Sequence, residues 1–582
     1  MQAFSASRAD QAPLQAGRGG RGLILLGISS LDKESTVAIL RDGVLTFALS
    51  EERLTREKQQ AGFPDRSLEA ALAFENLRPD EIDAVAYPFL NCNDEARLIL
   101  GCLARSAAGL PRAFPRDPGS SLRHLYYFGR WSGKAIVDHR RYQRDLESGL
   151  RRWGILARLR RVEHHEAHAS TAYYASGFAR ALILTVDAYG SGLTTTLSLG
   201  EAGSIRRIHS VRFPHSMGMF YAQVTKALGF VPDRHEGKIL GLAAYGKAGP
   251  LAARVRGRFI ERNGTFEAPW LFDRQYVRAL AGSHSREDLA AAWQENLEKV
   301  LVRYLVHHLE RHRVDCVALA GGVMANVKLN QRIAEAPGVS RVFIYPAMND
   351  SGTGAGAALT VQASLAAVRP ARLRDVFLGP SFTEKEVEAA LAGKGLVTRL
   401  MPDPAEEIGE LLARGKTVAR CAGRMEYGPR ALGNRSILYP AVDPRANQWL
   451  NEKLKRTEFM PFAPATLVEH AARCYRNLEV AADAARFMTI TYDCTDYMKQ
   501  VSPAAVHVDG TARPQLVDPE TNPSFHAILS AYHRRTGIPS VLNTSFNIHE
   551  EPIVCTPADA VATFLAGHLD YLALGDLLVS RA

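Results

Sequence analysis

The chain has 582 residues, of which 46% are hydrophobic and 8% aromatic, and it carries a formal net charge of +10. This length exceeds one ordinary core and favours roughly three or four domain-sized units, and the apolar content excludes a disordered chain. No uninterrupted apolar run approaches the ~20 residues of a membrane span, so we expect a soluble protein without a membrane partner. Seven cysteines without a C-x-x-C pair argue against a disulfide framework and a thiolate zinc site, and they predict a reducing cytoplasm.

The positive charge is spread along the chain, and no block of five or more like charges occurs. The densest basic stretches, such as "HRRYQRDLESGLRRWGILARLRR", are typical of solvated helix faces, so nucleic acid is not expected as a partner. The first 21 residues lack the apolar middle of a signal peptide, and we expect a flexible tail there.

The first half of the chain alternates strand-like and helix-like segments. "GLILLGISS" and "STVAILRDGVLTFALSEER" predict a hairpin that opens a sheet, followed by the amphipathic "SLEAALAFENL" and the strand "AVAYPFL". Further along, an apolar strand ends in Asp187 before a glycine turn and a strand rich in threonine.

Two later segments, "VDCVALAGGVMANVKLNQRIAEA" and "RVFIYPAMNDSGTGAGAALTVQASLA", each predict a strand, a glycine-rich turn and a helix. Such a turn presents backbone N–H groups and a helix N-terminus to a phosphate. In the first of them Gly321, Gly322 and Asn326 are candidates for binding a nucleotide.

The stretch "EHHEAHAS" places His164 and His168 four residues apart, on one face of a predicted helix, where the pair could bind a metal. The H-E-x-x-H pattern of zinc proteases is not met, because its second histidine would stand one residue further along. Asp187 and Asp350 lie at predicted strand ends, where ligands collect in open α/β sheets. Together the four side chains would make a mixed nitrogen and oxygen site that suits Fe(II), Mn or Zn. Taken alone, the two histidines are explained equally well as surface residues, and each aspartate is explained better as a helix cap or a turn former.

Around residue 372 the composition changes, and we place a domain boundary there, with residues 373–582 forming one further domain. This part concentrates polar residues beside glycine and proline turns. "GRMEYGPRALGNRS" holds three arginines whose guanidinium groups suit phosphate or carboxylate. The other polar residues come from "NEKLKRTEFMPFAPA", "HVDGTARPQLV" and "VLNTSFNIHEEPIV": Lys453, Lys455, Arg456, His507, Arg513, Asn543, Thr544, Ser545 and Asn547.

Seven motifs, in this order, carry a family resemblance: "EERLTREKQQAGFP", "HHEAHAS", "EGKILGLAAYG", "LAGGVMANVKLN", "NDSGTGAGAAL", "GRMEYGPRALGNRSIL" and "NTSFNIHEEPIVCTPADA". They resemble those of the NodU/CmcH carbamoyltransferases, and the resemblance covers residues 22–582. It implies an α/β protein with a two-lobed, actin-like ATPase domain at residues 22–372 and an α+β YrdC-like domain at residues 373–582.

The resemblance implies a reaction in two steps. The YrdC-like domain converts ATP, with Mg²⁺, and carbamoyl phosphate into carbamoyl-adenylate. The actin-like domain then passes the carbamoyl group to a hydroxyl of a small-molecule acceptor, such as a natural product or a sugar. The family's iron ligands match His164, His168, Asp187 and Asp350, so Fe(II) or another divalent transition metal is expected.

The resemblance also assigns residues of the second domain. Arg430 and Arg513 would hold carbamoyl phosphate, while Lys455 and Arg456 add charge at the same anion. Arg430 and Lys455 therefore count as catalytic candidates. Asn543 and Ser545 would contact the nucleotide.

Three departures from the family pattern stand out. Relatives carry His-Asp in G-x-x-x-x-H-D-x-S, whereas this chain reads "GISSLDKES", and Asp32 is our candidate for the base that activates the acceptor. The stretch before "PFAP" is one residue shorter, which leaves open whether Arg456 or Lys453 fills the arginine position of the family. Glu550 stands where many members have glycine.

Three other functions compete with this interpretation. Threonylcarbamoylation of tRNA fits the basic composition, but related tRNA systems keep the two domains on separate chains. Hydrogenase-maturation carbamoyltransferases place the YrdC-like unit first and carry C-x-x-C motifs. A nucleotide-binding sensor without catalysis would not need the arginine clusters. The sequence is compatible with a homodimer and does not identify the acceptor.

Overall fold

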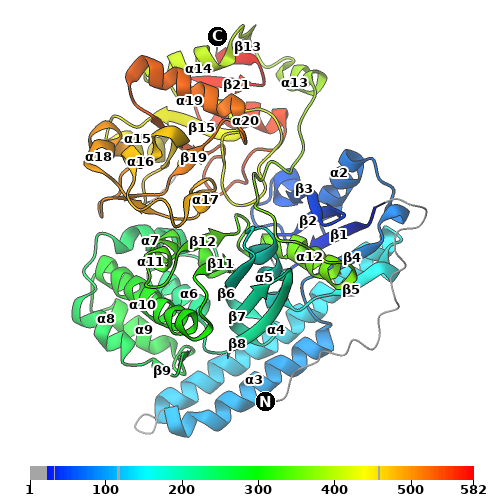
Figure 1. Ribbon diagram of the computed structural model, residues 1–582, viewed down its shortest axis with the longest axis vertical. Coiled ribbons are helices and arrows are strands. Elements are labelled where there is room, and N and C mark those ends of the chain that lie inside the picture. The colour runs from blue at the N-terminus through cyan, green and yellow to red at the C-terminus, as the bar shows by residue number, and fades with distance from the viewer. Residues whose placement is uncertain (1–21, 32, 114–117, 456–458, 582) are drawn as a thin grey trace.

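The computed structural model describes residues 22–31, 33–113, 118–455 and 459–581. Within these ranges the protein has a mixed α/β fold with three main sheets. Figure 1 shows the largest sheet and its helices in the upper part of the molecule, above the two smaller sheets. The predicted alternation of strands and helices is confirmed.

The first sheet has the strand order β3-β2-β1-β4-β5. Its hairpin and its following strand are those predicted from the sequence, and the amphipathic stretch forms α2 (Asp65–Glu75). Strands β1, β2 and β3 are antiparallel, and β1, β4 and β5 run parallel. The strand bounds are β1 (Ile24–Ser29), β2 (Thr36–Arg41), β3 (Val44–Ser50), β4 (Ala84–Tyr87) and β5 (Leu159–Arg161).

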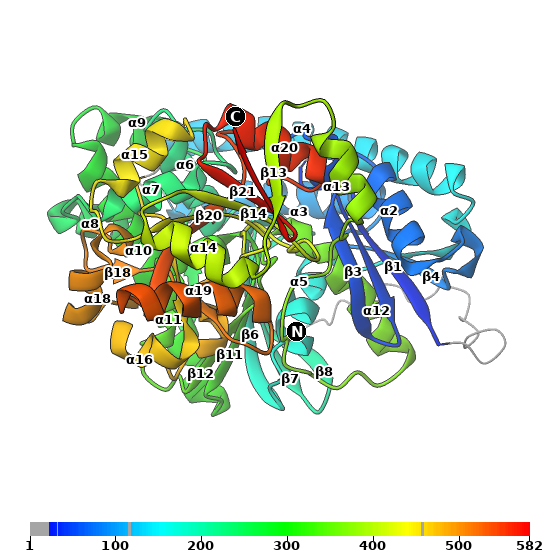
Figure 2. The same ribbon diagram turned by 90° about the horizontal axis from the view of Figure 1, so that it is seen from above.

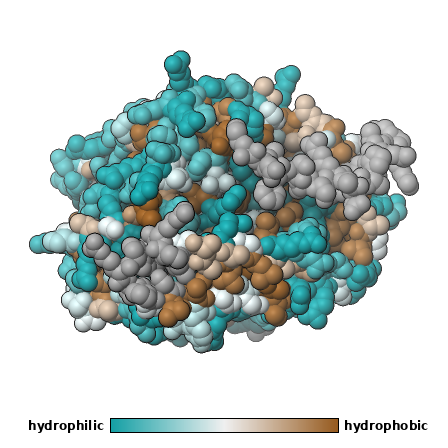
Figure 3. Space-filling model, turned by 90° about the horizontal axis from the view of Figure 1, so that it is seen from below, coloured by the Kyte–Doolittle hydropathy of each residue, from teal (hydrophilic) through white to brown (hydrophobic). Residues whose placement is uncertain are grey.

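Between β4 and β5 the chain forms two long helices, α3 (Cys92–Ala113) and α4 (Pro118–Arg152), which pack against each other. They occupy the lower edge of the molecule in Figure 1. Viewed from below, this face shows hydrophobic residues in patches among hydrophilic ones (Figure 3). Exposed apolar residues on the two helices include Leu100, Leu122 and Val137. None of the helices in the described ranges has both the length and the apolar character needed to cross a membrane.

The second sheet has the order β12-β11-β6-β7-β8. Strands β6, β11 and β12 run parallel, and β6, β7 and β8 form an antiparallel meander. The bounds are β6 (Arg180–Gly190), β7 (Leu193–Glu201), β8 (Ser204–Arg212), β11 (Cys316–Ala320) and β12 (Arg341–Ile344). Helices cover its outer face, among them α6 (Met217–Ala227), α7 (Glu236–Ala243), α10 (Arg286–His312) and α11 (Val327–Ala334).

Two helices fill the space between these sheets. Helix α12 (Thr353–Leu365) packs on the first sheet, α5 (His164–Tyr174) packs on the second, and the two helices pack on each other. The crossing is close, because a Cβ atom on Gly356 would lie 2.0 Å from the carbonyl oxygen of Ala167. A Cβ on Gly27 would lie 2.1 Å from the carbonyl oxygen of Gly354. Glycines therefore permit the layering that brings the N-terminal ends of both helices beside the end of β6.

The third sheet has eight strands in the order β13-β22-β21-β14-β15-β20-β16-β19. Helices α14 (Pro404–Ala413) and α19 (Pro523–Thr536) lie side by side on it (Figures 1 and 2). The bounds are β13 (Leu396–Leu400), β14 (Val418–Cys421), β15 (Arg435–Pro440), β16 (Ala463–Leu467), β19 (Gln515–Val517), β20 (Ser540–Ser545), β21 (Tyr571–Leu574) and β22 (Leu577–Arg581).

The third sheet is joined to the rest of the molecule by a continuous apolar core. One cluster of buried residues contains Trp293 from α10 as well as Leu542 from β20. The segment between α12 and residue 384 has neither helix nor strand. In it the carbonyl oxygen of Leu378 accepts from the Ala48 amide (3.2 Å) and that of Val376 from the Tyr427 amide (2.8 Å). The domain boundary near residue 372 stays a prediction.

Candidate active site

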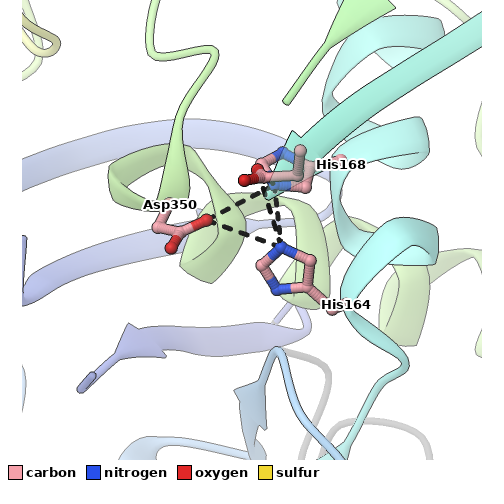
Figure 4. A group of neighbouring side chains, drawn as sticks. His164, His168 and Asp350 are labelled. Atoms are coloured by element: carbon pink, nitrogen blue, oxygen red, sulfur yellow. Dashed lines mark hydrogen bonds and ion pairs between the residues drawn. The ribbon is translucent and has the colours of Figure 1, made fainter. Parts of the chain in front are cut away.

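Four side chains that are distant in the sequence meet where α5, β6 and the start of α12 converge. His164 and His168 come from α5, Asp187 from β6, and Asp350 from the 3-10 turn η5 (Asp350–Gly352) that precedes α12. One ligand atom of each lies within 4.8 Å of the others. Figure 4 shows both imidazole rings turned toward Asp350. The structure therefore brings together all four residues that the sequence proposed as metal ligands.

The distances within this cluster describe a small, crowded cage. The Nε2 atoms of the two histidines are 3.1 Å apart. His168 Nε2 lies 3.2 Å from Asp187 Oδ2 and 3.5 Å from Asp350 Oδ1. His164 Nε2 lies 3.8 Å and 3.5 Å from the same two oxygens. Two nitrogens and two oxygens thus point at one common volume.

The cluster is shielded from solvent and strongly polarised. Both histidine side chains are buried, while the two aspartates are half-buried. Burial alone would lower the pKa of His168, but hydrogen bonds to Asp187 and Asp350 prevail and raise it to about 9. Burial likewise opposes the charge of Asp187, yet the two histidines hold its pKa well below the usual range. The carboxylates therefore draw positive charge into the cluster.

A divalent cation fits this donor set. Asp350 Oδ1 is buried and, within the described residues, has no hydrogen-bond partner besides the histidine contacts at 3.5 Å. A buried, under-satisfied carboxylate oxygen is costly unless something positive coordinates it. Imidazole nitrogens and carboxylate oxygens together suit Fe(II), Mn or Zn.

Asp187 reaches the cluster through an irregularity in β6. We expected the strand to end at Asp187, but it continues to Gly190. The register against β7 shifts between Val186 and Gly190, so Asp187 lies in a bulged segment, and bulges redirect side chains. Its carboxylate accepts from the backbone N–H of Gly322 (3.0 Å) and of Ala188 (2.6 Å).

The nucleotide candidates after β11 adjoin this centre. The N–H of Gly321 donates to the carbonyl oxygen of Met348 (2.7 Å), and that of Gly322 donates to Asp187. Asn326 caps α11 by accepting from the N–H of Leu329 at 3.0 Å. These groups are thus engaged within the chain, and nucleotide binding by these residues stays a prediction.

The turn after β1, where the family pattern changes, approaches the same centre. The candidate base Asp32 lies outside the described residues. Sequence reasoning missed Glu34, whose carboxylate accepts from Asn349 Nδ2 at 2.6 Å, one residue before Asp350. Burial is the largest influence on Glu34 and raises its pKa to about 7. Its backbone is left-handed (φ 59°), a strained conformation for a non-glycine residue.

A second polar centre lies in the loop between β14 and β15, which we call the arginine loop (residues 422–434). Glu426 organises it: one buried carboxylate oxygen accepts from the backbone N–H groups of Leu432 (2.8 Å), Asn434 (2.8 Å) and Arg435 (3.1 Å). Within this loop Arg430 is half-buried. Glu426 was not predicted from the sequence, although a glutamate placed between glycines and arginines is a signal for a residue that organises such a loop.

Two arginines of the same motif turn out to be structural. The sequence suggested that Arg424 and Arg435 also present guanidinium forks to an anion. Arg424 donates instead to the carbonyl oxygens of Gly379 (3.0 Å), Leu378 (2.6 Å) and Thr46 (2.9 Å). Arg435 is fully buried and donates to the carbonyl oxygen of Cys555 (3.1 Å) and to carbonyls of its own loop. That expectation is wrong, because backbone carbonyl oxygens of the chain occupy both guanidinium groups.

Hydrogen bonds bring the neighbours of the other anion candidates together. Gln515, two residues after Arg513, donates to the carbonyl oxygen of Leu432 in the arginine loop (2.7 Å). Asn543 donates to Gln515 Oε1 (2.7 Å) and lies on β20, which ends at Ser545. The segments that carry Arg430, Arg513, Asn543 and Ser545 therefore meet at one end of the third sheet. Gln515 is a further residue that the sequence analysis missed.

The remaining basic candidates of this domain lie at the end of α15 (Ala446–Lys453) and directly after it. Lys455 is exposed and has a left-handed backbone (φ 54°). The carbonyl oxygen of the preceding Leu454 accepts from the N–H of His549 at 3.2 Å, which places Lys455 near the loop after β20. Lys453 Nζ lies 4.4 Å from the centre of the Trp449 ring. Arg456 lies outside the described residues.

The arginine loop packs against the segment that carries Asp350, a member of the metal-ligand cluster of His164, His168, Asp187 and Asp350. The hydroxyl of Tyr427 donates to the carbonyl oxygen of Ser351, the residue after Asp350. Arg53 donates to the carbonyl oxygen of Gly428 at 3.0 Å. On another side Glu550, in the left-handed region (φ 66°), forms an ion pair with Arg234 at 2.8 Å. The arginine loop thus packs against the segment that carries Asp350 and against Arg53.

Two family models match successive parts of this chain. Residues 24–359 match the family model described as carbamoyltransferase N-terminus, and residues 409–581 match the model described as carbamoyltransferase C-terminus. The chain belongs to the carbamoyltransferase family. Named relatives show that it is of the NodU/CmcH type, and the protein is an enzyme of the carbamoyltransferase class.

Three relatives illustrate the similarity. The nodulation protein NolNO of Sinorhizobium fredii is 32% identical, over 96% of this chain and 82% of that protein. An uncharacterised protein of Synechocystis is 30% identical, over 96% of both chains. The 3'-hydroxymethylcephem-O-carbamoyltransferase of Amycolatopsis lactamdurans is 29% identical, over 60% of this chain and 65% of that enzyme. Among solved structures, full-length HypF aligns with a TM-score of 0.33 and 12% identity, over 61% of this chain and 48% of that one.

Proposed function

We propose that this carbamoyltransferase is an ATP-dependent O-carbamoyltransferase for a small-molecule acceptor. It forms carbamoyl-adenylate from carbamoyl phosphate and ATP and then transfers the carbamoyl group to an acceptor hydroxyl. Membership in the family supports carbamoyl transfer, and the relative from Amycolatopsis is named for O-carbamoylation of a hydroxymethyl group.

The observation that carries the proposal is the packing of the arginine loop on the segment that carries Asp350. Tyr427 of the arginine loop contacts Ser351, and Ser351 follows the cluster residue Asp350 in the chain. The arginine loop, beside which the adenylate would form, therefore adjoins the segment that carries a ligand of the metal. A protein with a single binding function would not need both polar centres.

In the adenylation step, basic residues would bind the anionic substrates. Arg430 and Arg513 would hold carbamoyl phosphate through charge-assisted hydrogen bonds, and Lys455 and Arg456 would add positive charge. Asn543 and Ser545 would orient the nucleotide of Mg²⁺-bound ATP. Water would cleave carbamoyl phosphate into carbamate and phosphate. A carbamate oxygen would then attack the α-phosphate of ATP, which forms carbamoyl-adenylate and releases pyrophosphate.

In the transfer step, the metal-ligand cluster would act on the carbamoyl group, and the turn after β1 would act on the acceptor. His164, His168, Asp187 and Asp350 would hold Fe(II) or another divalent metal, which as a Lewis acid supplies polarisation of a carbonyl. Asp32 would accept the proton of the acceptor hydroxyl. Glu34 lies two residues after Asp32 in the same turn and accepts a hydrogen bond from Asn349. Its side chain would form part of the polar wall that faces the acceptor.

The fold supports the same division of labour. We assign the two five-stranded sheets with α5 and α12 to an actin-like domain at residues 22–372, and the eight-stranded sheet to a YrdC-like domain at residues 373–582. Residues 1–21, our predicted tail, lie outside the described residues. A cytoplasmic location and a homodimer remain predictions.

The proposal is tested with purified protein, ATP and carbamoyl phosphate. Pyrophosphate should be released only when carbamoyl phosphate is present. When small-molecule extracts are added, mass spectrometry should find a compound that has gained one carbamoyl group. Pyrophosphate release that is independent of carbamoyl phosphate would contradict the adenylation step. Carbamoylation of tRNA instead of a small molecule would contradict the acceptor class.

A further inference from the structure

The turn between β6 and β7 lies directly against a residue of the metal-ligand cluster. Ser191 (φ 46°) and Gly192 (φ 79°) form its two-residue tip, and both have left-handed backbones, as in tight hairpins. The preceding Gly190 faces His164, and a Cβ atom at Gly190 would lie only 2.1 Å from Cδ2 of the His164 ring. Any shift of this turn toward α5 would therefore displace the ring of His164.

One face of helix α3 forms hydrogen bonds with this turn. Glu95, Leu98 and Cys102 are spaced three and four residues apart and so share a face of the helix. The Glu95 carboxylate accepts from the hydroxyl of Ser191 (2.6 Å) and from that of Tyr189 (3.0 Å).

The rest of this face also reaches the tip of the turn. Cys102 Sγ donates to the carbonyl oxygen of Gly192 at 3.5 Å. A Cβ at Gly192 would lie 3.3 Å from Cβ of Leu98. The hydroxyls held by Glu95 thus flank Gly190 on both sides, and the contacts of Leu98 and Cys102 fix the residue beyond.

Glu95 is an unusual residue to find in this position. Its side chain is fully buried, and burial, the largest influence, raises its pKa to about 7. A buried carboxyl group is costly, and an apolar residue of similar volume would pack the same helix face at less expense. A role that needs two directed hydrogen bonds accounts for its presence.

We propose that Glu95 is a positioning residue for the metal centre: it holds the Tyr189–Ser191 turn, and through Gly190 the ring of His164, in the geometry that metal binding needs. The inference rests on the proposed function, because it assumes that the His/Asp cluster binds a divalent cation. The inference gives α3 a role in the transfer centre: it would orient a metal ligand without binding the metal itself.

Asp273 offers a matched control on the same helical pair. It is buried, precedes α9 (Arg274–Ala281) and accepts from Ser120 Oγ of α4 at 2.6 Å and from Arg123 Nε at 3.1 Å. Its carboxylate thus ties α4 to the body of the protein as Glu95 ties α3, but it contacts no residue of the metal-ligand cluster.

The test measures Co²⁺ affinity of full-length, chelator-treated protein by titration calorimetry and by the visible spectrum of the bound ion. Glu95→Ala should weaken binding by about tenfold or more, in the range seen when groups that orient metal ligands are removed. Glu95→Gln, which keeps the shape and one carbonyl acceptor, should recover most of the affinity. Asp273→Asn should bind Co²⁺ like the wild type even if its melting temperature falls.

The outcomes separate the inference from the proposed function. Wild-type affinity and spectrum in Glu95→Ala would overturn the positioning role while leaving the metal site intact. An equal loss of affinity in Asp273→Asn would also overturn it, since a general loosening of the helices would then explain the effect. A wild-type protein that binds neither Co²⁺ nor Fe²⁺ would reject the metal site itself and the inference with it. If Glu95→Ala does not fold, the spectrum of Glu95→Gln decides. Loss of one of the two acceptor oxygens should shift the spectrum of bound Co²⁺ even where the affinity recovers, and an unchanged spectrum would overturn the positioning role.

Discussion

Replacing Gly190 by alanine should displace a metal ligand without removing any polar group. The new methyl carbon would lie 2.1 Å from Cδ2 and 2.6 Å from Cγ of His164. Carbon atoms in contact are about 3.5 Å apart or more, so the ring or the turn must move by about 1.4 Å. Metal-ligand distances tolerate about 0.2 Å. His164 should therefore cease to be a ligand, and overpacking should cost about 1–3 kcal/mol of stability.

The assay for Gly190→Ala is metal content after anaerobic purification, combined with thermal unfolding. Gly133→Ala is the control, since Gly133 lies in α4 and a Cβ there would meet nothing within 4 Å. That change should raise stability by up to about 1 kcal/mol, because alanine favours helix over glycine. A Gly190→Ala protein with full metal content and wild-type stability would refute the reasoning.

Three further predictions concern single residues. His168→Ala should purify with no bound transition metal, and stoichiometric metal in that variant would reject His168 as a ligand. The pKa of His168 rises from 6.5 to about 9 on folding; in chelator-treated protein its stabilisation is thus complete below about pH 6.5 and is lost up to about pH 9, on the order of 3 kcal/mol. Melting curves between pH 6 and 10 should show this loss in the wild type relative to His168→Gln, and parallel curves would contradict it. Asp32→Asn should slow carbamoyl transfer by roughly 10² to 10⁴ while pyrophosphate release continues; an unchanged transfer rate would show that Asp32 is not the base.

The sequence predicted the order of strands and helices well, because apolar periodicity and glycine turns are local signals. It also nominated the four ligand residues, because His164 and His168 share a helix face and Asp187 and Asp350 lie near predicted strand ends, and the family resemblance singled them out as metal ligands. It did not show that β6 continues beyond Asp187 as a bulge, because a register shift depends on the partner strand.

What the sequence missed depends on contacts between distant segments. Arg435 sits among glycines like an anion-binding residue, yet it donates to the backbone carbonyl of Cys555, 120 residues away. Glu95 resembles an ordinary acidic residue in the first turn of a helix, and only the fold brings it to the turn after Asp187. Gln515 carries no motif of its own, and its role emerges from bonds to Leu432 and Asn543.

The measurement that tests the two-centre account most directly compares Asp350→Asn with Arg430→Ala in both half-reactions. Arg430→Ala removes charge-assisted hydrogen bonds worth about 1.5–3 kcal/mol each, so carbamoyl-phosphate-dependent pyrophosphate release and acceptor carbamoylation should fail together. Asp350→Asn keeps the side-chain shape but removes a negative ligand, so it should still release pyrophosphate and no longer carbamoylate the acceptor. If folded Asp350→Asn, checked by its melting profile, loses pyrophosphate release as completely as Arg430→Ala, the separation of adenylation from transfer is contradicted.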